Sequence, residues 1–186
     1  MFAVLAACAG GGATLNSDLI EERFGSYGVE IVSEDERKRI SSLYSMADGT
    51  RVTRTWAVVE YMGRPSAALA SEHADIVAGG SIGKTFRDAG WEVSKQNLYV
   101  GELELTTDYT EIGERMQVEL PANVVVHQYL FTVARDERSY SYARITEVHH
   151  PAFLTETEIE QLYGEIVFDD SNRDSIHDFL GPPSTK

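Results

Sequence analysis

A glutamate and several histidines have the chemistry of metal ligands, because carboxylate oxygens and imidazole nitrogens both bind zinc. Glu147 and His149 stand two residues apart, so the alternation of a strand places both side chains on one face. His127 or His73 could supply a third ligand, and His150 directly follows His149. The spacing itself demands no third ligand. The sequence therefore predicts a polar strand end here, with no metal ion and no other cofactor.

A second motif is the stretch AGGSIGKT at residues 78–85. Ala78, four further residues and then Gly83-Lys84-Thr85 satisfy the relaxed pattern of a phosphate-binding loop. A working loop follows a buried apolar strand in a parallel α/β fold. The preceding ASEHADIV instead contains ionisable residues and has helical periodicity. We interpret the match as accidental and expect a turn between two helices, with no bound nucleotide.

The lone cysteine lies in a third motif, close to the start of the chain. Leu5-Ala6-Ala7-Cys8 is an aliphatic residue, two small residues and a cysteine, and it resembles the lipobox of bacterial lipoproteins. In that family a membrane peptidase cuts before the cysteine, whose thiol carries a diacylglycerol. Only Met1 to Ala7 precede Cys8 and none of them is basic, so the resemblance implies a truncated signal peptide that begins upstream.

The lipobox implies a place in the cell. Cys8 would hold the protein on a lipid bilayer, since each buried methylene contributes roughly 0.8 kcal/mol. Residues 1–17 would be the signal remnant, the lipobox and a glycine-rich flexible tether. Ala9 after the cysteine favours the periplasmic side of the outer membrane of a bacterial envelope. The alternative is a cytoplasmic protein with an unremarkable Cys8. No family resemblance covers the folded part of the chain.

The charge balance argues against nucleic acid as a partner. Among the 186 residues, 30 are Asp or Glu and 16 are Lys or Arg, which gives a net charge of −14. Binding to phosphates needs a concentration of basic residues. The one basic cluster, residues 37–39, follows EDE at residues 34–36 and is locally neutralised. A single cysteine also excludes an internal disulfide, and no apolar run approaches the ~20 residues of a membrane-spanning helix.

Two hairpins dominate the pattern of the remaining sequence. One turns on Asp-Gly within residues 47–50, and the other turns at residues 135–138. Residues 43–65 align weakly with residues 130–151, and a helical segment follows each. We therefore expect an α+β fold, with an antiparallel sheet built from two hairpin-plus-helix units and with the helices packed on one face.

Other elements follow from local signals. Residues 91–105 and 114–120 read as strands, and residues 18–24 as a short amphipathic helix or the end of the tether. Thr155 and Glu158 have the spacing of a capping box at a helix start. One globular domain should span residues 18–180, followed by a disordered tail at 181–186.

A non-catalytic binding or assembly role fits these observations best. The domain would be anchored in the envelope, and its partner would be another envelope protein or a small ligand. An alternative is a small hydrolase or metal-binding enzyme. Convergence of His73, His127, Glu147 and His149 in one pocket would favour that alternative. A further alternative is a cytosolic protein of unknown role.

Overall fold

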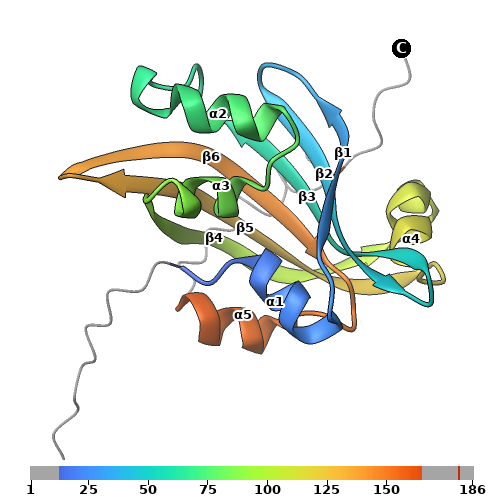
Figure 1. Cartoon of the computed structure of the whole chain (residues 1–186). Helices are drawn as coiled ribbons and strands as arrows, with labels where there is room; N and C mark the ends of the chain where they lie inside the picture. The colour runs from blue at the N-terminus through green and yellow to red at the C-terminus, as the bar shows by residue number, and fades with distance from the viewer. Residues whose placement is uncertain (1–12, 165–179, 181–186) are drawn as a thin grey trace, which may run out of the picture.

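Six antiparallel strands form one sheet in the computed structural model, which describes residues 13–164 and 180 (Figure 1). The sheet order is β1-β2-β3-β6-β5-β4, so the two expected hairpins meet where β3 pairs with β6. This arrangement confirms the α+β class. The strands are β1 (Gly28–Glu34), β2 (Lys38–Ala47), β3 (Thr50–Tyr61), β4 (Glu92–Leu105), β5 (Ala122–Arg135) and β6 (Arg138–His149).

Both predicted hairpin turns are present. Asp48 and Gly49 join β2 to β3 with φ of 50° and 80°, and Asp136 and Glu137 join β5 to β6 with φ of 49° and 62°. Two central residues at positive φ match the right-handed twist of the strands that they connect. The Asp-Gly pair therefore predicts the position of the β2–β3 turn correctly.

Helices α2, α3 and α4 lie in connections between strands, whereas α1 precedes β1 and α5 follows β6. The predicted capping box is confirmed, because the Thr155 side chain accepts from the Glu158 amide while the Glu158 carboxylate accepts from the Thr155 amide. The helices are α1 (Asn16–Phe24), α2 (Ala70–Val77), α3 (Ile82–Asp88), α4 (Thr110–Met116) and α5 (Glu156–Tyr163), with 3-10 turns η1 (Ala67–Leu69) and η2 (Thr107–Tyr109).

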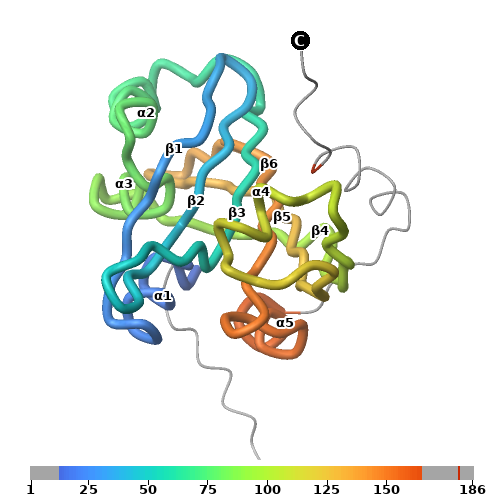
Figure 2. The backbone as a smooth tube through the Cα atoms, turned by 90° about the vertical axis from the view of Figure 1, so that its right-hand side faces the viewer, coloured from blue at the N-terminus to red at the C-terminus, as the bar shows by residue number. Residues whose placement is uncertain are grey.

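The helices cover both faces of the sheet, where the sequence indicated one. The apolar side chains of α1, α2, α3 and α5 pack on the face that carries Val59 and Phe131 or on its continuation over β4 and β5. Helix α4 packs its Ile112 and Met116 against Trp56 on the opposite face. Figure 2 shows α4 away from α2 and α3.

One predicted strand is wrong. Residues 114–116 form the last turn of α4, because Ile112 and Met116 are spaced by four residues and are both buried on one helical face, and residues 117–120 form no strand. Gln117 then ends the helix in the left-handed conformation.

The folded part begins earlier than residue 18. Leu15 is only 3% exposed, Asn16 and Ser17 are buried, and the Ala13 amide donates to the Val93 carbonyl at 2.9 Å. Residues 13–17 thus belong to the packed domain and not to a tether. The expected lipobox with Cys8 and the expected tail at 181–186 lie outside the described residues. None of the helices within 13–164 is long and apolar enough to span a membrane.

Removal of the α5 cap tests this local assignment. We expect Thr155→Ala to lower the free energy of unfolding by about 0.5–2 kcal/mol, because the Glu158 amide loses its acceptor. Urea unfolding of both proteins measures the change. Thr107→Ala, at another exposed threonine, should stay within about 0.5 kcal/mol of the parent. Equal losses in the two variants would contradict a specific cap.

Candidate functional site

A cavity of about 60 Å³ lies between the sheet and helices α1 and α3. Its floor comes from β2, β3, β5 and β6, and its roof from residues 15–17 and 81–83. Such a volume holds several water molecules or one compact organic molecule. The walls combine apolar groups with a few polar ones, as ligand sites commonly do. The apolar lining residues include Leu43, Val59, Phe131 and Ile145, and the polar ones include Arg39, Lys95, Tyr129 and Glu147.

Arg39 brings a buried positive charge to this cavity. Arg39 is only 1% exposed. Its Nη1 donates to the Ile76 carbonyl at 2.9 Å and its Nη2 to the Gly80 carbonyl at 3.0 Å. Its Nε has no hydrogen-bond partner, and no carboxylate of the described residues lies within 4.0 Å of the guanidinium. A buried cation without a counter-ion is costly, so this group is one that an anion would stabilise.

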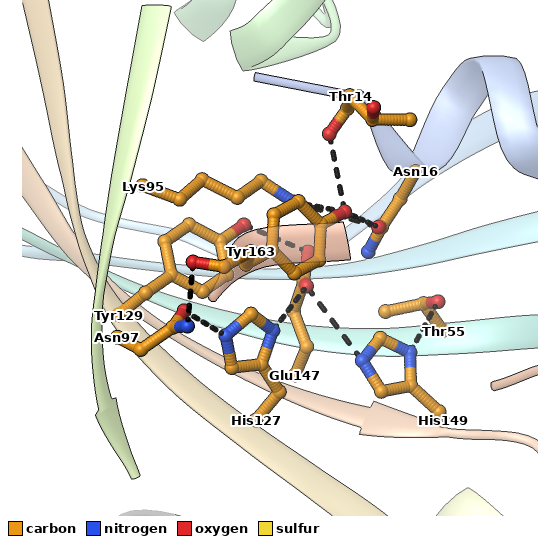
Figure 3. Close-up of polar contacts among 10 residues, drawn as sticks. All are labelled: Thr14, Asn16, Thr55, Lys95, Asn97, His127, Tyr129, Glu147, His149 and Tyr163. Carbon is orange, nitrogen blue, oxygen red and sulfur yellow. Dashed lines mark hydrogen bonds and ion pairs between the residues drawn. The ribbon is translucent and has the colours of Figure 1, made fainter. Parts of the chain in front are cut away.

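Lys95 adds a second cation on the opposite wall (Figure 3). Its Nζ donates to the Tyr163 hydroxyl at 3.2 Å and to Asn16 Oδ1 at 3.5 Å, and it lies 4.6 Å from the centre of the Tyr129 ring. The Asn16 Nδ2 group, at the start of α1, has no partner. With Arg39 and Lys95 against one carboxylate, the lining is net positive in a chain of net charge −14.

The stretch that resembles a phosphate loop forms part of the roof. Helix α2, and not a strand, precedes it, and Gly79 turns the chain at φ 115° before α3. This is the expected helix–helix turn. A Cβ on Gly83 would lie 2.7 Å from the Leu15 side chain, so glycine lets α1 and α3 pack closely above the cavity. Lys84 lies within α3 and is absent from the cavity lining.

Three of the sequence candidates for metal binding lie together beside the cavity. His127 Nδ1 is 4.0 Å and His149 Nε2 is 3.8 Å from Glu147 Oε2, and all three residues are buried. They stand on the paired strands β5 and β6, with His127 directly opposite Glu147 (Figure 3). We call these residues the histidine–glutamate cluster. Glu147 is also part of the cavity wall, so the cluster and the cavity are continuous.

Hydrogen bonds fix which atoms of the cluster carry protons. Asn97 Nδ2 donates to the carbonyls of Tyr163 and Gly164, so Asn97 Oδ1 must accept from His127 Nε2 at 2.9 Å. In a neutral His127, Nδ1 therefore carries no hydrogen, and it faces Glu147. Burial lowers the pKa of His127 well below its usual value and that of His149 to about 3, so both rings are neutral near pH 7.

The outer atoms of the cluster are each held by a neighbour. The Tyr129 hydroxyl donates to Glu147 Oε1 at 2.9 Å, and Thr55 Oγ1 lies 3.1 Å from His149 Nδ1. The inner atoms, namely His127 Nδ1, Glu147 Oε2 and His149 Nε2, have no partner. Three acceptor atoms therefore converge without a hydrogen between them when Thr55 accepts from His149.

His73 and His150 do not join the cluster. His73 lies in α2, is partly buried, and pairs through Nδ1 with the hydroxyl of the core residue Tyr142 at 2.8 Å. His150 Nδ1 accepts from the Ala152 amide at 2.9 Å, in the turn after β6. Sequence reasoning missed Arg39, because it treated residues 37–39 as one neutralised surface cluster. The signal was the alternation of β2, which turns Arg39, Ser41 and Leu43 to the same face.

Comparison with known proteins gives little guidance. No protein-family model and no curated protein matches this chain. Among solved structures, the crystal structure of the PhnF C-terminal domain is similar, with a TM-score of 0.44 and 10% sequence identity. That match covers 73% of this chain and 76% of the other. At this level of similarity, the chemistry of the site has to be argued from its own residues.

Removal of the Tyr129 hydroxyl tests the polar network. Tyr129→Phe leaves Glu147 Oε1 without its donor, so we expect the free energy of unfolding to fall by about 1.5–3 kcal/mol. Tyr140→Phe, at a partly buried tyrosine of β6, is the matched control and should change stability by less than about 0.5 kcal/mol. Urea unfolding compares the two. A neutral effect of Tyr129→Phe would mean that the bond contributes nothing to folding.

Proposed function

We propose that this is a binding domain that takes a small organic anion, such as a carboxylate, into the cavity beneath α1 and α3. The observation that carries the proposal is the Arg39 guanidinium, which is buried with a free Nε and without a carboxylate within 4.0 Å among the described residues. The role is non-catalytic, in line with the sequence analysis. A bound carboxylate would supply the missing counter-charge and accept charge-assisted hydrogen bonds.

The surroundings of Arg39 support recognition of a small organic molecule. The carbonyls of Ile76 and Gly80 fix the plane of the guanidinium, so the fork is already oriented before a ligand arrives. Val59, Phe131 and Ile145 give the cavity an apolar wall that suits an organic body. Lys95 offers a second positive charge across the cavity.

Charge-selective stabilisation tests the proposal. Carboxylates small enough for this cavity, such as formate and acetate, should raise the melting temperature, whereas their neutral amides should not. At a concentration 100 times the dissociation constant, a ligand stabilises the native state by about 2.7 kcal/mol. For a domain of this size that equals roughly 5–10 °C. Thermal unfolding and calorimetric titration measure both effects.

A pair of arginine variants provides the control. Arg39→Met should abolish the carboxylate response, because the counter-charge and the fork are lost. Arg54→Met removes another buried arginine, which donates to Ser45 and does not line the cavity, and should leave the response intact. Equal stabilisation by the amides, or an unchanged response in Arg39→Met, would refute anion binding in this cavity.

The place of the domain in the cell is a separate proposal. The lipobox-like Leu5-Ala6-Ala7-Cys8 supports attachment to a bacterial envelope membrane through lipid on Cys8. The packed domain starts by residue 13, so a lipid on Cys8 would hold the roof of the cavity within a few residues of the bilayer.

Metabolic labelling tests the anchor. Cells that express the native gene with its upstream sequence should incorporate labelled palmitate into this protein, and Cys8→Ser should remove the label and release the protein from the membrane fraction. An unlabelled wild-type protein in the cytosolic fraction would leave the cytoplasmic alternative in place.

A further inference from the structure

We infer that the histidine–glutamate cluster is a binding site for a divalent transition-metal ion, with zinc the best match. The ligands are His127 Nδ1, Glu147 Oε2 and His149 Nε2, which all lie within 4.8 Å of one another. This inference does not rest on the proposed anion site, because Arg39 contributes no atom to the cluster.

No hydrogen lies between the three ligand atoms when Thr55 accepts from His149 Nδ1. A buried acceptor left without a partner costs about 1–3 kcal/mol, and in this tautomer three of them converge. A single water molecule has two hydrogens and so cannot satisfy three acceptors. One cation satisfies all three, which explains why they are arranged inward.

The spacing of the three ligand atoms is close to that of a zinc site. Zinc binds histidine nitrogen and carboxylate oxygen at about 2.0–2.2 Å, so two ligands of a tetrahedral site lie about 3.3–3.6 Å apart. The distances of 3.8 Å and 4.0 Å to Glu147 Oε2 exceed this separation by less than about 1 Å. All three atoms lie within 4.8 Å of one another, so the widest pair has to close by at most about 1.5 Å, which rotation of the two histidine side chains can supply.

Each ligand residue also has an outer hydrogen-bond partner. Asn97 accepts from His127 Nε2, Thr55 contacts His149 Nδ1, and Tyr129 donates to Glu147 Oε1. Such outer partners fix ring orientation and tautomer in metal sites. The ligands themselves stand on adjacent strands, which hold them more rigidly than loops do.

The ligand set defines the class of ion. Two neutral imidazoles and one carboxylate match the three protein ligands of open zinc sites, in which a water or a small ligand takes the fourth position. Magnesium and calcium prefer sites made of oxygen atoms. Glu147 borders the cavity, so the fourth position and the route for the ion lie on that side. The nearby positive charge of Lys95 opposes the ion, and the Glu147 carboxylate offsets it.

Metal titration tests the inference. The full-length untagged chain with Cys8→Ser, which removes a competing thiol, is stripped with a chelator and titrated with zinc by calorimetry. We expect one ion per chain. Cobalt should give the visible absorption bands of a low-coordinate site, and zinc should displace it.

Matched histidine variants locate the site. His127→Gln and His149→Gln should each weaken zinc binding by about 100-fold or more, whereas His150→Gln and His73→Gln should stay within about twofold. Circular dichroism verifies that each variant is folded, and the titration of the parent chain is decisive even if one is not.

Two outcomes would overturn the inference. One is a parent chain that binds no zinc at a ratio of one to one, and the other is loss of binding in His150→Gln equal to that in His149→Gln. Arg39→Met separates the two sites, because it should abolish the response to carboxylates and leave zinc binding unchanged. Failure of one proposal therefore remains distinguishable from failure of the other.

Discussion

The bond between the Arg39 guanidinium and two backbone carbonyls joins the sheet to its helical roof. Arg39 stands on β2, whereas Ile76 O lies in α2 and Gly80 O in the turn before α3. One side chain therefore ties the sheet to the segment that covers it and places a positive charge between the two. A chain with net charge −14 keeps this charge inside, away from its acidic surface. Such a buried charge is costly for folding alone, and the proposed anion would offset that cost.

The cavity and the histidine–glutamate cluster adjoin at Glu147. Glu147 belongs to both, and Tyr129 lines the cavity while it donates to the Glu147 carboxylate. The two sites nevertheless favour opposite charges. Arg39 and Lys95 attract an anion from one side, and the inward lone pairs of the cluster attract a cation from the other. An ion at the cluster would add positive charge near the cavity and strengthen its preference for anions.

Local signals in the sequence predicted most of the elements, the segment at 114–120 excepted, but not the register that assembles the site. The Asp-Gly turn and the Thr155 capping box follow from residues in direct contact, so both were predictable. His127 was not. The turn after β5 pairs Arg135 with Arg138, and that register would place His127 opposite Thr146, on the wrong face. A bulge between Phe131 and Thr132 shifts the pairing by one and brings His127 opposite Glu147. Arg39 was missed because the alternation of side chains along β2 decides that it points inward, whereas the sequence interpretation rested on the charges of its neighbours.

The NMR signal of the Arg39 Nε–H group during titration with acetate tests the central claim most directly. The signal is assigned by its loss in Arg39→Met, and the Nε–H of Arg54, which donates to Ser45, serves as the internal reference. Anion binding at the guanidinium predicts a saturable shift of the Arg39 signal while that of Arg54 stays fixed, and no shift with acetamide. An Arg39 signal that stays in place, or that moves in parallel with that of Arg54, would contradict the account.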